Sequence, residues 1–303
     1  MAQPKMHADE LDLDAAFVRG LVADQFPHWA DLPIARVASA GTDNAIFRLG
    51  DALAIRLPRR QSSTPQVDKE QRWLPLLAPQ LPLEIPAPIA YGEPAHGYPW
   101  RWSVYRWLDG IDGNAAVAAD SRATARSLAA FVSALRAVDP TDGPAAGTHN
   151  FYRGAPLAQR DPFVRRAIAA LANDVDSAAV TRAWDAALAS PPWDRPPLWV
   201  HGDLAPGNLL FRGDRLAAVI DFGGLGVGDP ACDLIVAWNF FSADARSAFL
   251  SALAPDGATR ARGRGWALST ALIAWPYYRD TNPALVAQSV RTIDAVMSEW
   301  DHR

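Results

Sequence analysis

One segment, residues 198–223, constrains the fold of this chain more than any other part of it. Three short apolar runs in this segment are typical of strands, and a polar loop and a turn separate them. The polar loop contains Gly and Pro and carries His201, Asp203 and Asn208. Polar side chains on a loop held between strands often form a functional site. The three strands are expected at 198–200, 208–211 and 216–220.

The chemistry of these side chains suits phosphoryl transfer. Asp221 follows the last strand, and a short hairpin brings it beside Asn208, so that two hard oxygen ligands suited to Mg²⁺ lie together. Asp203 is a separate carboxylate, five residues before Asn208. It is placed to orient an attacking hydroxyl and to accept its proton, while the other two residues hold Mg²⁺ on the phosphates.

The rest of the chain divides into a β-rich part of about one hundred residues and a longer helix-rich part, as expected of an α+β protein with two lobes. We place the boundary near Leu108–Gly113, which gives predicted domains at 1–108 and 109–303. Further strands are expected at 34–40, 45–49, 52–57 and 102–107, and the proline-rich stretch 75–99 is expected to be extended and rich in turns. Helices are expected at 12–26, 66–77, 121–138, 161–189, 231–252, 258–279 and 283–300. Pro75 is expected to break the second of these helices after Leu74.

The polar loop and the strand after it also resemble a known family. His201-Gly202-Asp203 with Asn208, followed by Ile220-Asp221-Phe222-Gly223, is similar to the catalytic and metal segments of the aminoglycoside/macrolide phosphotransferases. This resemblance implies a protein-kinase-like fold with a small antiparallel sheet lobe and a larger helical lobe. It also implies a catalytic Asp203, Mg²⁺ on Asn208 and Asp221, and ATP or GTP as the phosphoryl donor. Gly202 replaces the Arg of protein kinases, which is the small-molecule kinase variant.

The resemblance extends to the N-terminal part, where it implies contacts with the nucleotide. Arg56 takes the place of the strand lysine that contacts the α- and β-phosphates, and Glu70 that of its helix partner. Arginine keeps the positive charge but is not interchangeable with lysine. The other implied nucleotide contacts are Gly41, Thr42, Asp43 and Asn44 above the phosphates, Tyr105, Arg106 and Leu108 at the hinge, and Leu210 and Ile220 below the base.

Each of these residues also has a structural interpretation. The turn at 41–44 is typical of an ordinary hairpin, Arg56 and Glu70 of a surface charge pair, and the apolar residues of core packing. His201, Asp229 and Asp233 are expected to support the catalytic loop or the substrate side, and a helix cap at Asp229 is an equal alternative. Aromatic residues of the C-terminal helices form either core or a wall of the acceptor pocket, and the acceptor candidates are Trp238, Trp275 and Tyr278.

The charge of the helical part bears on the acceptor. Residues 231–303 hold seven acids and seven arginines, and residues 151–200 hold five acids and six arginines. A pocket for polycationic aminoglycosides should be strongly acidic by complementarity. We therefore expect a small-molecule alcohol that is neutral or weakly charged.

Composition excludes several other classes. The net charge is −4, which disfavours a nucleic-acid partner, and only Lys5 and Lys69 are lysines among the 29 basic residues. The single cysteine, Cys232, allows no intrachain disulfide and no zinc site built from cysteines. We find no apolar run long enough to span a membrane and no signal peptide, and we expect a cytoplasmic enzyme.

Two other functions stay open at this point. The Lys-to-Arg change at Arg56 allows a non-catalytic nucleotide-binding module of kinase-like fold, although Asp203, Asn208 and Asp221 are all present. A protein kinase is a weaker alternative, because no activation loop and no Ala-Pro-Glu follow Asp221. The identity of the acceptor, the choice of ATP or GTP and the oligomeric state do not follow from the sequence.

Overall fold

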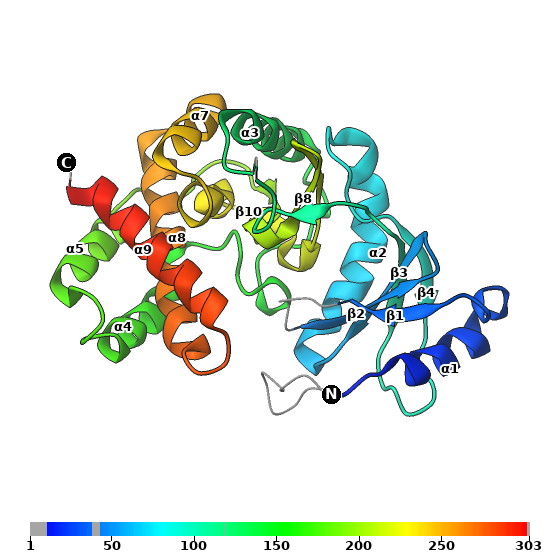
Figure 1. Ribbon diagram of the computed structural model, residues 1–303. Helices are drawn as coiled ribbons and strands as arrows, with labels where there is room; N and C mark the ends of the chain where they lie inside the picture. The colour runs from blue at the N-terminus through cyan, green and yellow to red at the C-terminus, as the bar shows by residue number, and fades with distance from the viewer. Residues whose placement is uncertain (1–10, 38–42, 118, 302–303) are drawn as a thin grey trace.

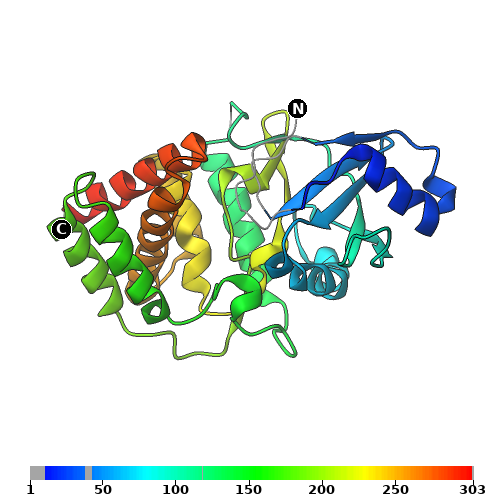
Figure 2. The ribbon, with the colours of Figure 1, turned by 90° about the horizontal axis from the view of Figure 1, so that it is seen from below.

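The computed structural model describes residues 11–37, 43–117 and 119–301. A five-stranded sheet lies at one end of the molecule and most of the helices lie at the other (Figures 1 and 2). The hairpin that carries Asn208 and Asp221 lies between these two ends. This is the α+β arrangement with an antiparallel sheet and a helical C-terminal part that the sequence predicts.

The N-terminal sheet is antiparallel, with the strand order β1-β2-β3-β5-β4. The predicted hairpin at its centre is confirmed, because Leu49 pairs with Leu53 and Asn44 with Pro58. Gly50 turns the chain with a φ of +57°, which glycine adopts without strain. The strands are β1 (Ile34–Arg36), β2 (Asn44–Leu49), β3 (Leu53–Pro58), β4 (Pro88–Gly92) and β5 (Trp102–Arg106).

Two helices accompany this sheet. Helix α1 (Ala15–Gln25) begins where the Asp14 carboxylate accepts a hydrogen bond from the N–H of Phe17. Helix α2 (Pro65–Leu77) continues past Pro75, two residues beyond the predicted break. Pro75 lies in the last turn, where its missing N–H removes only one helical hydrogen bond. Helix α2 also positions the buried Glu70.

The C-terminal part adds two small antiparallel sheets and seven helices to the described structure. One sheet pairs β10 with β7, and the other has the order β6-β8-β9. The short strands are β6 (Ile111–Asp112), β7 (Leu198–Val200), β8 (Leu209–Arg212), β9 (Arg215–Val219) and β10 (Gly226–Gly228). The helices are α3 (Arg122–Ala137), α4 (Asp161–Ala170), α5 (Ser177–Leu188), α6 (Val236–Asn239), α7 (Ala243–Leu253), α8 (Gly257–Tyr278) and α9 (Pro283–Asp301).

Three expectations about these elements are corrected. The predicted helix 161–189 is two helices, because the Asp176 carboxylate accepts from the N–H groups of Ala178 and Ala179 and starts α5 anew. The predicted helix 231–252 is also divided, into a 3₁₀ segment, the short α6 and then α7. Strand β4 lies inside the proline-rich stretch that was expected to be only extended, and it occupies an edge of the sheet, where proline is tolerated.

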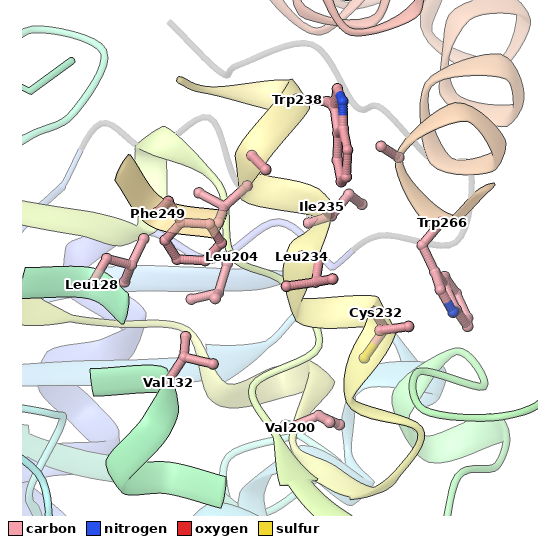
Figure 3. Packing of buried hydrophobic residues seen from close by; sticks show 14 of the residues in the cluster. Leu128, Val132, Val200, Leu204, Cys232, Leu234, Ile235, Trp238, Phe249 and Trp266 are labelled. Carbon is pink, nitrogen blue, oxygen red and sulfur yellow. The ribbon is translucent and has the colours of Figure 1, made fainter. Parts of the chain in front are cut away.

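Two hydrophobic clusters hold these parts together. The smaller cluster joins α1 to the sheet through residues such as Val18, Phe47 and Trp102. The larger cluster fills the C-terminal part, and Leu204, next to Asp203 in the sequence, belongs to it with Leu128 and Phe249 (Figure 3). The loop that carries Asp203 is therefore anchored in the core by its own apolar residue. In the part of the chain that the structure describes, no helix has the length and apolarity to cross a membrane.

Candidate active site

The loop between β7 and β8 is fixed by buried hydrogen bonds from two side chains. His201 is fully buried, and its Nε2 lies 3.1 Å from the carbonyl oxygen of Ile220 while its Nδ1 accepts from the N–H of Asp203 at 3.2 Å. This pattern assigns the proton to Nε2. The carboxylate of Asp233 accepts from the N–H groups of His201 and Gly202 at 2.9 and 2.7 Å. The predicted supporting roles of His201 and Asp233 thus have a direct geometric basis.

Gly202 cannot be replaced without moving this loop. Its φ is +82°, and a Cβ there would lie 2.4 Å from the carbonyl oxygen of Gly224. The catalytic loop therefore packs backbone against backbone on the segment that follows Asp221. This contact explains why glycine stands at the position where protein kinases have arginine.

Asp203 and Asn208 lie together on the exposed side of the loop. The Asn208 amide nitrogen donates to the backbone oxygen of Asp203 at 2.8 Å and to its carboxylate Oδ2 at 3.2 Å. Half of the Asp203 side chain is exposed, at 49%. Burial of the rest and the nearby charge of Asp221 raise the pKa of Asp203, although Arg153 opposes this effect. A carboxylate with a raised pKa is a stronger proton acceptor.

Asp221 is held in a left-handed conformation at the end of β9, with a φ of +63°. Its Oδ1 accepts from Arg56 Nη2 at 2.8 Å. Burial alone would raise the pKa of Asp221, but the positive charge of Arg56 lowers it below its usual range, so that the carboxylate is ionised.

Asp221 and Asn208 provide a donor set that fits Mg²⁺. Among the described residues, no hydrogen-bond donor contacts Asn208 Oδ1 or Asp221 Oδ2, so one amide and one carboxylate oxygen are free. The described part of the chain holds no group of three or more His, Cys, Asp or Glu side chains that could bind a metal alone. Mg²⁺ is commonly bound by one or two protein oxygens together with substrate phosphates and water.

Arg56, on β3, is the centre of a charged network that joins the sheet to α2 and to Asp221. Its Nη1 donates to Glu70 Oε1 at 2.5 Å, and Tyr105 donates to Glu70 Oε2 at 2.5 Å. With its amide oxygen turned toward Arg56, Asn44 accepts from Nε and Nη2 at 3.1 and 2.9 Å. Burial disfavours the charge, but the carboxylates of Glu70 and Asp221 raise the pKa of Arg56. The predicted Arg56–Glu70 pair is therefore present and buried, not on the surface.

Of the four predicted nucleotide contacts at residues 41–44, the structure describes two, and both lie near Arg56 or Asp221. Asp43 lies close enough to Asp221 that burial and this negative charge raise its pKa. Gly41 and Thr42 lie outside the described residues. Asn44, Arg56, Gln66, Val67, Glu70 and Tyr105 line a small hollow.

The predicted hinge differs from expectation at one residue. The N–H of Arg106 donates to the carbonyl oxygen of Ala87 at 2.9 Å and so is not free for a purine, whereas a purine contact through the carbonyl oxygen of Arg106 stays a prediction. In the described part of the chain, the backbone of Leu108 has no such partner. Tyr105 is buried, and its place behind the purine stays a prediction. Leu210 is buried and Ile220 half-buried on the strands below, so both stay candidates for base contacts.

Two further candidates are structural. Asp229 accepts from the N–H of Ala231 as a helix cap and forms a two-point ion pair with Arg262, with both side chains 4% exposed. Trp238 is 2% exposed, and its indole donates to Glu299 at 2.8 Å (Figure 3). Trp238 therefore packs between helices, and the prediction that it contacts the acceptor is wrong. Trp275 and Tyr278 are half-buried on α8 and remain predictions.

Sequence reasoning missed Lys69, which ties α2 to the segment after Asp221. Its ammonium donates to the carbonyl oxygens of Gly223 and Leu225 at 2.7 and 3.0 Å, and it lies 3.4 Å from His149 Nδ1. Burial lowers the pKa of Lys69 to about 8. The only signal in the sequence is that lysine is so rare in this chain.

Sequence reasoning also missed Arg153, which reaches Asp203 from the helical side. Arg153 Nη2 lies 3.8 Å from Asp203 Oδ1, and Nη1 donates to Thr270 Oγ1 on α8 at 3.1 Å. Its guanidinium lies over the ring of Trp266 at 5.7 Å from the ring centre. The carboxylate that is placed to accept a proton therefore has a cation beside it.

A model of the phosphotransferase enzyme family matches residues 34–266, well over half of the chain. The chain belongs to this family. The match spans the Arg56–Glu70 pair, the loop of Asp203 and Asn208, and Asp221. Family membership and the geometry of these residues thus agree.

Solved structures of phosphotransferases share the fold. The GDP and kanamycin complex of an aminoglycoside 2''-phosphotransferase has a TM-score of 0.72 at 17% identity, with 93% of this chain and 98% of that chain covered. Macrolide 2'-phosphotransferase MphH from Brachybacterium faecium has a TM-score of 0.61 at 25% identity, with 93% and 97% covered. Macrolide 2'-phosphotransferase type I has a TM-score of 0.61 at 20% identity, with 92% and 97% covered. Comparison with curated protein sequences gives no match.

Proposed function

We propose that this phosphotransferase moves the γ-phosphoryl group of ATP or GTP to a hydroxyl group of a small molecule. The observation that carries the proposal is the placement of Asp203 beside Asn208 and within electrostatic reach of Asp221, with Arg56 and Glu70 behind them. In this scheme residues 1–108 form the nucleotide lobe, and residues 109–303 form the lobe with the catalytic loop and the acceptor site.

Asp203 performs the proton chemistry. It orients the acceptor hydroxyl and accepts its proton while the hydroxyl oxygen forms a bond to the γ-phosphorus. The bond from that phosphorus to the β–γ bridging oxygen breaks, and the nucleoside diphosphate leaves. Asn208 keeps the Asp203 carboxylate in place through its amide nitrogen. Most of the acceleration then comes from positioning and electrostatics.

Asn208 Oδ1 and Asp221 Oδ2 are the proposed Mg²⁺ ligands. Bound there, Mg²⁺ would neutralise charge on the phosphates of the nucleotide. Arg56 supplies a fixed positive charge near the phosphates, and Glu70 and Tyr105 hold it in position. The backbone of Leu108 is the proposed contact for the purine. A nucleoside triphosphate donor fits the predicted cytoplasmic location.

We propose an acceptor that is neutral or weakly charged. Related structures contain kanamycin or belong to macrolide phosphotransferases. In residues 151–200 and 231–303 the acids do not outnumber the arginines, and the residue beside Asp203 is an arginine. Neither stretch has the acid surplus that complementarity to a polycationic aminoglycoside would need.

Label transfer tests this function. A thermal-shift screen with nucleotides and hydroxyl-bearing antibiotics and metabolites identifies ligands, because a compound bound only by the folded state raises its stability. Transfer of the γ-phosphoryl group to a screening hit, dependent on Mg²⁺ and on Asp203, supports the proposal. Efficient phosphorylation of kanamycin would contradict the acceptor class. Nucleotide binding with neither transfer nor slow Mg²⁺-dependent hydrolysis would favour a non-catalytic module.

A further inference from the structure

A cluster of two arginines and one tryptophan lies on the helical side of Asp203. Arg153 and Arg160 both approach the ring of Trp266, at 5.7 and 5.0 Å from the ring centre. Each arginine also donates to a hydroxyl group on α8: Arg153 donates to Thr270 at 3.1 Å and Arg160 donates to Ser269 at 2.8 Å. The hydrogen bonds that hold the two cations in place therefore go to neutral partners.

This cluster has fewer carboxylates than arginines. Within the described ranges, Asp203 is the sole carboxylate within 4 Å of Arg153, at 3.8 Å, and Arg160 has none. The Arg153 side chain is only 12% exposed. Burial, reinforced by the charge of Arg153, lowers the pKa of Arg160 to about 9. With both arginines protonated, Arg153, Arg160 and Asp203 together carry one net positive charge.

The cluster is on the side of Asp203 from which an acceptor must approach. Arg56 reaches Asp221 from β3 of the sheet, whereas Arg153 reaches Asp203 from the side of α8. The sheet and α8 lie on opposite sides of the hairpin that carries Asp221 (Figure 1). In-line transfer places the acceptor across the γ-phosphorus from the departing diphosphate. The nucleotide therefore takes the Arg56 side and the acceptor takes the Arg153 side.

The backbone before Arg153 holds it in this place. Phe151 and Tyr152 adopt φ angles of +54° and +59°, which are strained for aromatic residues. The buried Asn150 fixes the turn, because its amide accepts from the N–H of Gly147 and donates to the carbonyl oxygen of Arg153, both at 3.0 Å. Phe151 and Tyr152 are 47% and 44% exposed, so two aromatic side chains lie at the surface next to Arg153 in the sequence.

We propose that the acceptor is a hydroxyl compound that also carries a carboxylate, and that Arg153 binds this carboxylate while Asp203 faces the hydroxyl. The inference rests on the proposed function and specifies its substrate class. A guanidinium binds a carboxylate through two parallel hydrogen bonds. The single net charge of the cluster matches a monoanion. A cationic acceptor would be repelled by both arginines.

Matched acceptors test this inference. Tropate, tropamide and 3-amino-2-phenylpropan-1-ol share a phenyl group and a primary hydroxyl but are anionic, neutral and cationic. The enzyme is incubated with these three compounds and with a pool of other hydroxy acids, each of which is paired with its carboxamide. Phosphorylated products are detected by mass spectrometry. We expect kcat/KM for the acids to exceed that for their amides by at least about tenfold, the effect of one charge-assisted hydrogen bond.

Variants connect the preference to Arg153. In Arg153→Gln the preference for acids disappears, and in Arg153→Lys it returns in part. Arg166→Gln, on the exposed face of α4, leaves it unchanged. A readout without turnover is the unfolding temperature with the preferred acid, which should rise for the wild type and for Arg166→Gln but not for Arg153→Gln.

The outcomes separate this inference from the function that it rests on. Phosphorylation of amides or amines in preference to acids, phosphorylation of no acid in the pool, or a preference that survives Arg153→Gln would each overturn the carboxylate proposal. Loss of all Mg²⁺-dependent phosphoryl transfer and nucleotide hydrolysis would count against the phosphotransferase mechanism as well.

Discussion

Two arginines approach the hairpin that carries Asn208 and Asp221 from opposite sides, and they differ in which groups compensate their positive charge. Arg56 is held between the carboxylates of Glu70 and Asp221, which raise its pKa. Arg153 is held by Thr270 and the face of Trp266, and its nearest carboxylate oxygen is 3.8 Å away. Burial and Arg153 together lower the pKa of Arg160, its neighbour at Trp266.

The difference in charge compensation indicates which kind of ligand the Arg56 side and the Arg153 side can bind. The positive charge of Arg56 is already compensated by Glu70 and Asp221, so Arg56 belongs to a rigid frame beside the proposed phosphate site. The Arg153 side keeps an excess of positive charge that a ligand can satisfy. A buried cation without a counterion is costly, and such costs are commonly retained at functional sites.

The largest expected effect on activity comes from removing the carboxylate of Asp203, which lies between the Arg56 side and the Arg153 side. Asp203→Asn removes the proton acceptor and keeps the size of the side chain. We expect turnover to fall by about 10²- to 10⁴-fold while nucleotide affinity is retained. Transfer assays and nucleotide titrations measure the two quantities. Asp214→Asn, in the exposed β8–β9 turn, is the matched control. Unchanged turnover in Asp203→Asn would remove the catalytic role.

A third arginine shows what a purely structural pair does. Arg262 and Asp229 are both 4% exposed, and Arg262→Met leaves the Asp229 charge buried without its counterion. We expect the free energy of unfolding to fall by about 3–5 kcal/mol, measured by urea denaturation.

The exposed pair Arg195–Asp256 provides the control for this prediction. Arg195→Met should cost less than about 1 kcal/mol. Equal losses of unfolding free energy in Arg262→Met and Arg195→Met would contradict this prediction, because they would show that burial does not decide how much each ion pair contributes to stability.

Local spacing explains which parts of the site the sequence predicts. Asp203, Asn208 and Asp221 lie within one strand–loop–hairpin unit, so their positions follow from a short stretch of chain. Lys69 and Arg153 were missed because their partners lie 154 and 117 residues away, and only tertiary packing brings them together. Aromatic composition could not separate Trp238, which packs in the core, from a pocket residue.

Lys69 extends the comparison to a cation held by carbonyl oxygens instead of carboxylates. Burial lowers its pKa to about 8, against 10.5 for a free lysine. Between these values the folded state binds fewer protons than the unfolded state, so the contribution of Lys69 to stability rises with pH. It is complete above the unfolded value and lost as the pH falls through the folded value. The total is up to about 3 kcal/mol.

The measurement compares unfolding of the wild type and Lys69→Met from about pH 7 to about pH 10. The difference should move in favour of the wild type as the pH rises. Because the chain has only two lysines, Lys5→Met is the matched control, and the Nζ resonance of Lys69 can be titrated directly by NMR. The prediction would be contradicted if the Lys69 resonance titrated near 10.5 and the difference in unfolding free energy between the wild type and Lys69→Met did not change with pH.

The smallest expected effect comes from the position where related kinases have lysine. Arg56→Lys keeps the charge but replaces a fork that contacts Glu70 and Asp221 at once with a single nitrogen. One of these charge-assisted bonds is lost, so we expect the KM for the nucleotide to rise about tenfold with a smaller change in kcat. Arg19→Lys, on helix α1, controls for the chemical change, because Arg19 contacts backbone oxygens of Ala30 and Leu32. If Arg56→Lys bound the nucleotide as well as the wild type, the positive charge at this position would suffice and the two-sided contact of the guanidinium with Glu70 and Asp221 would not matter. The contrast between Arg56 and Arg153 would then not follow from their contacts.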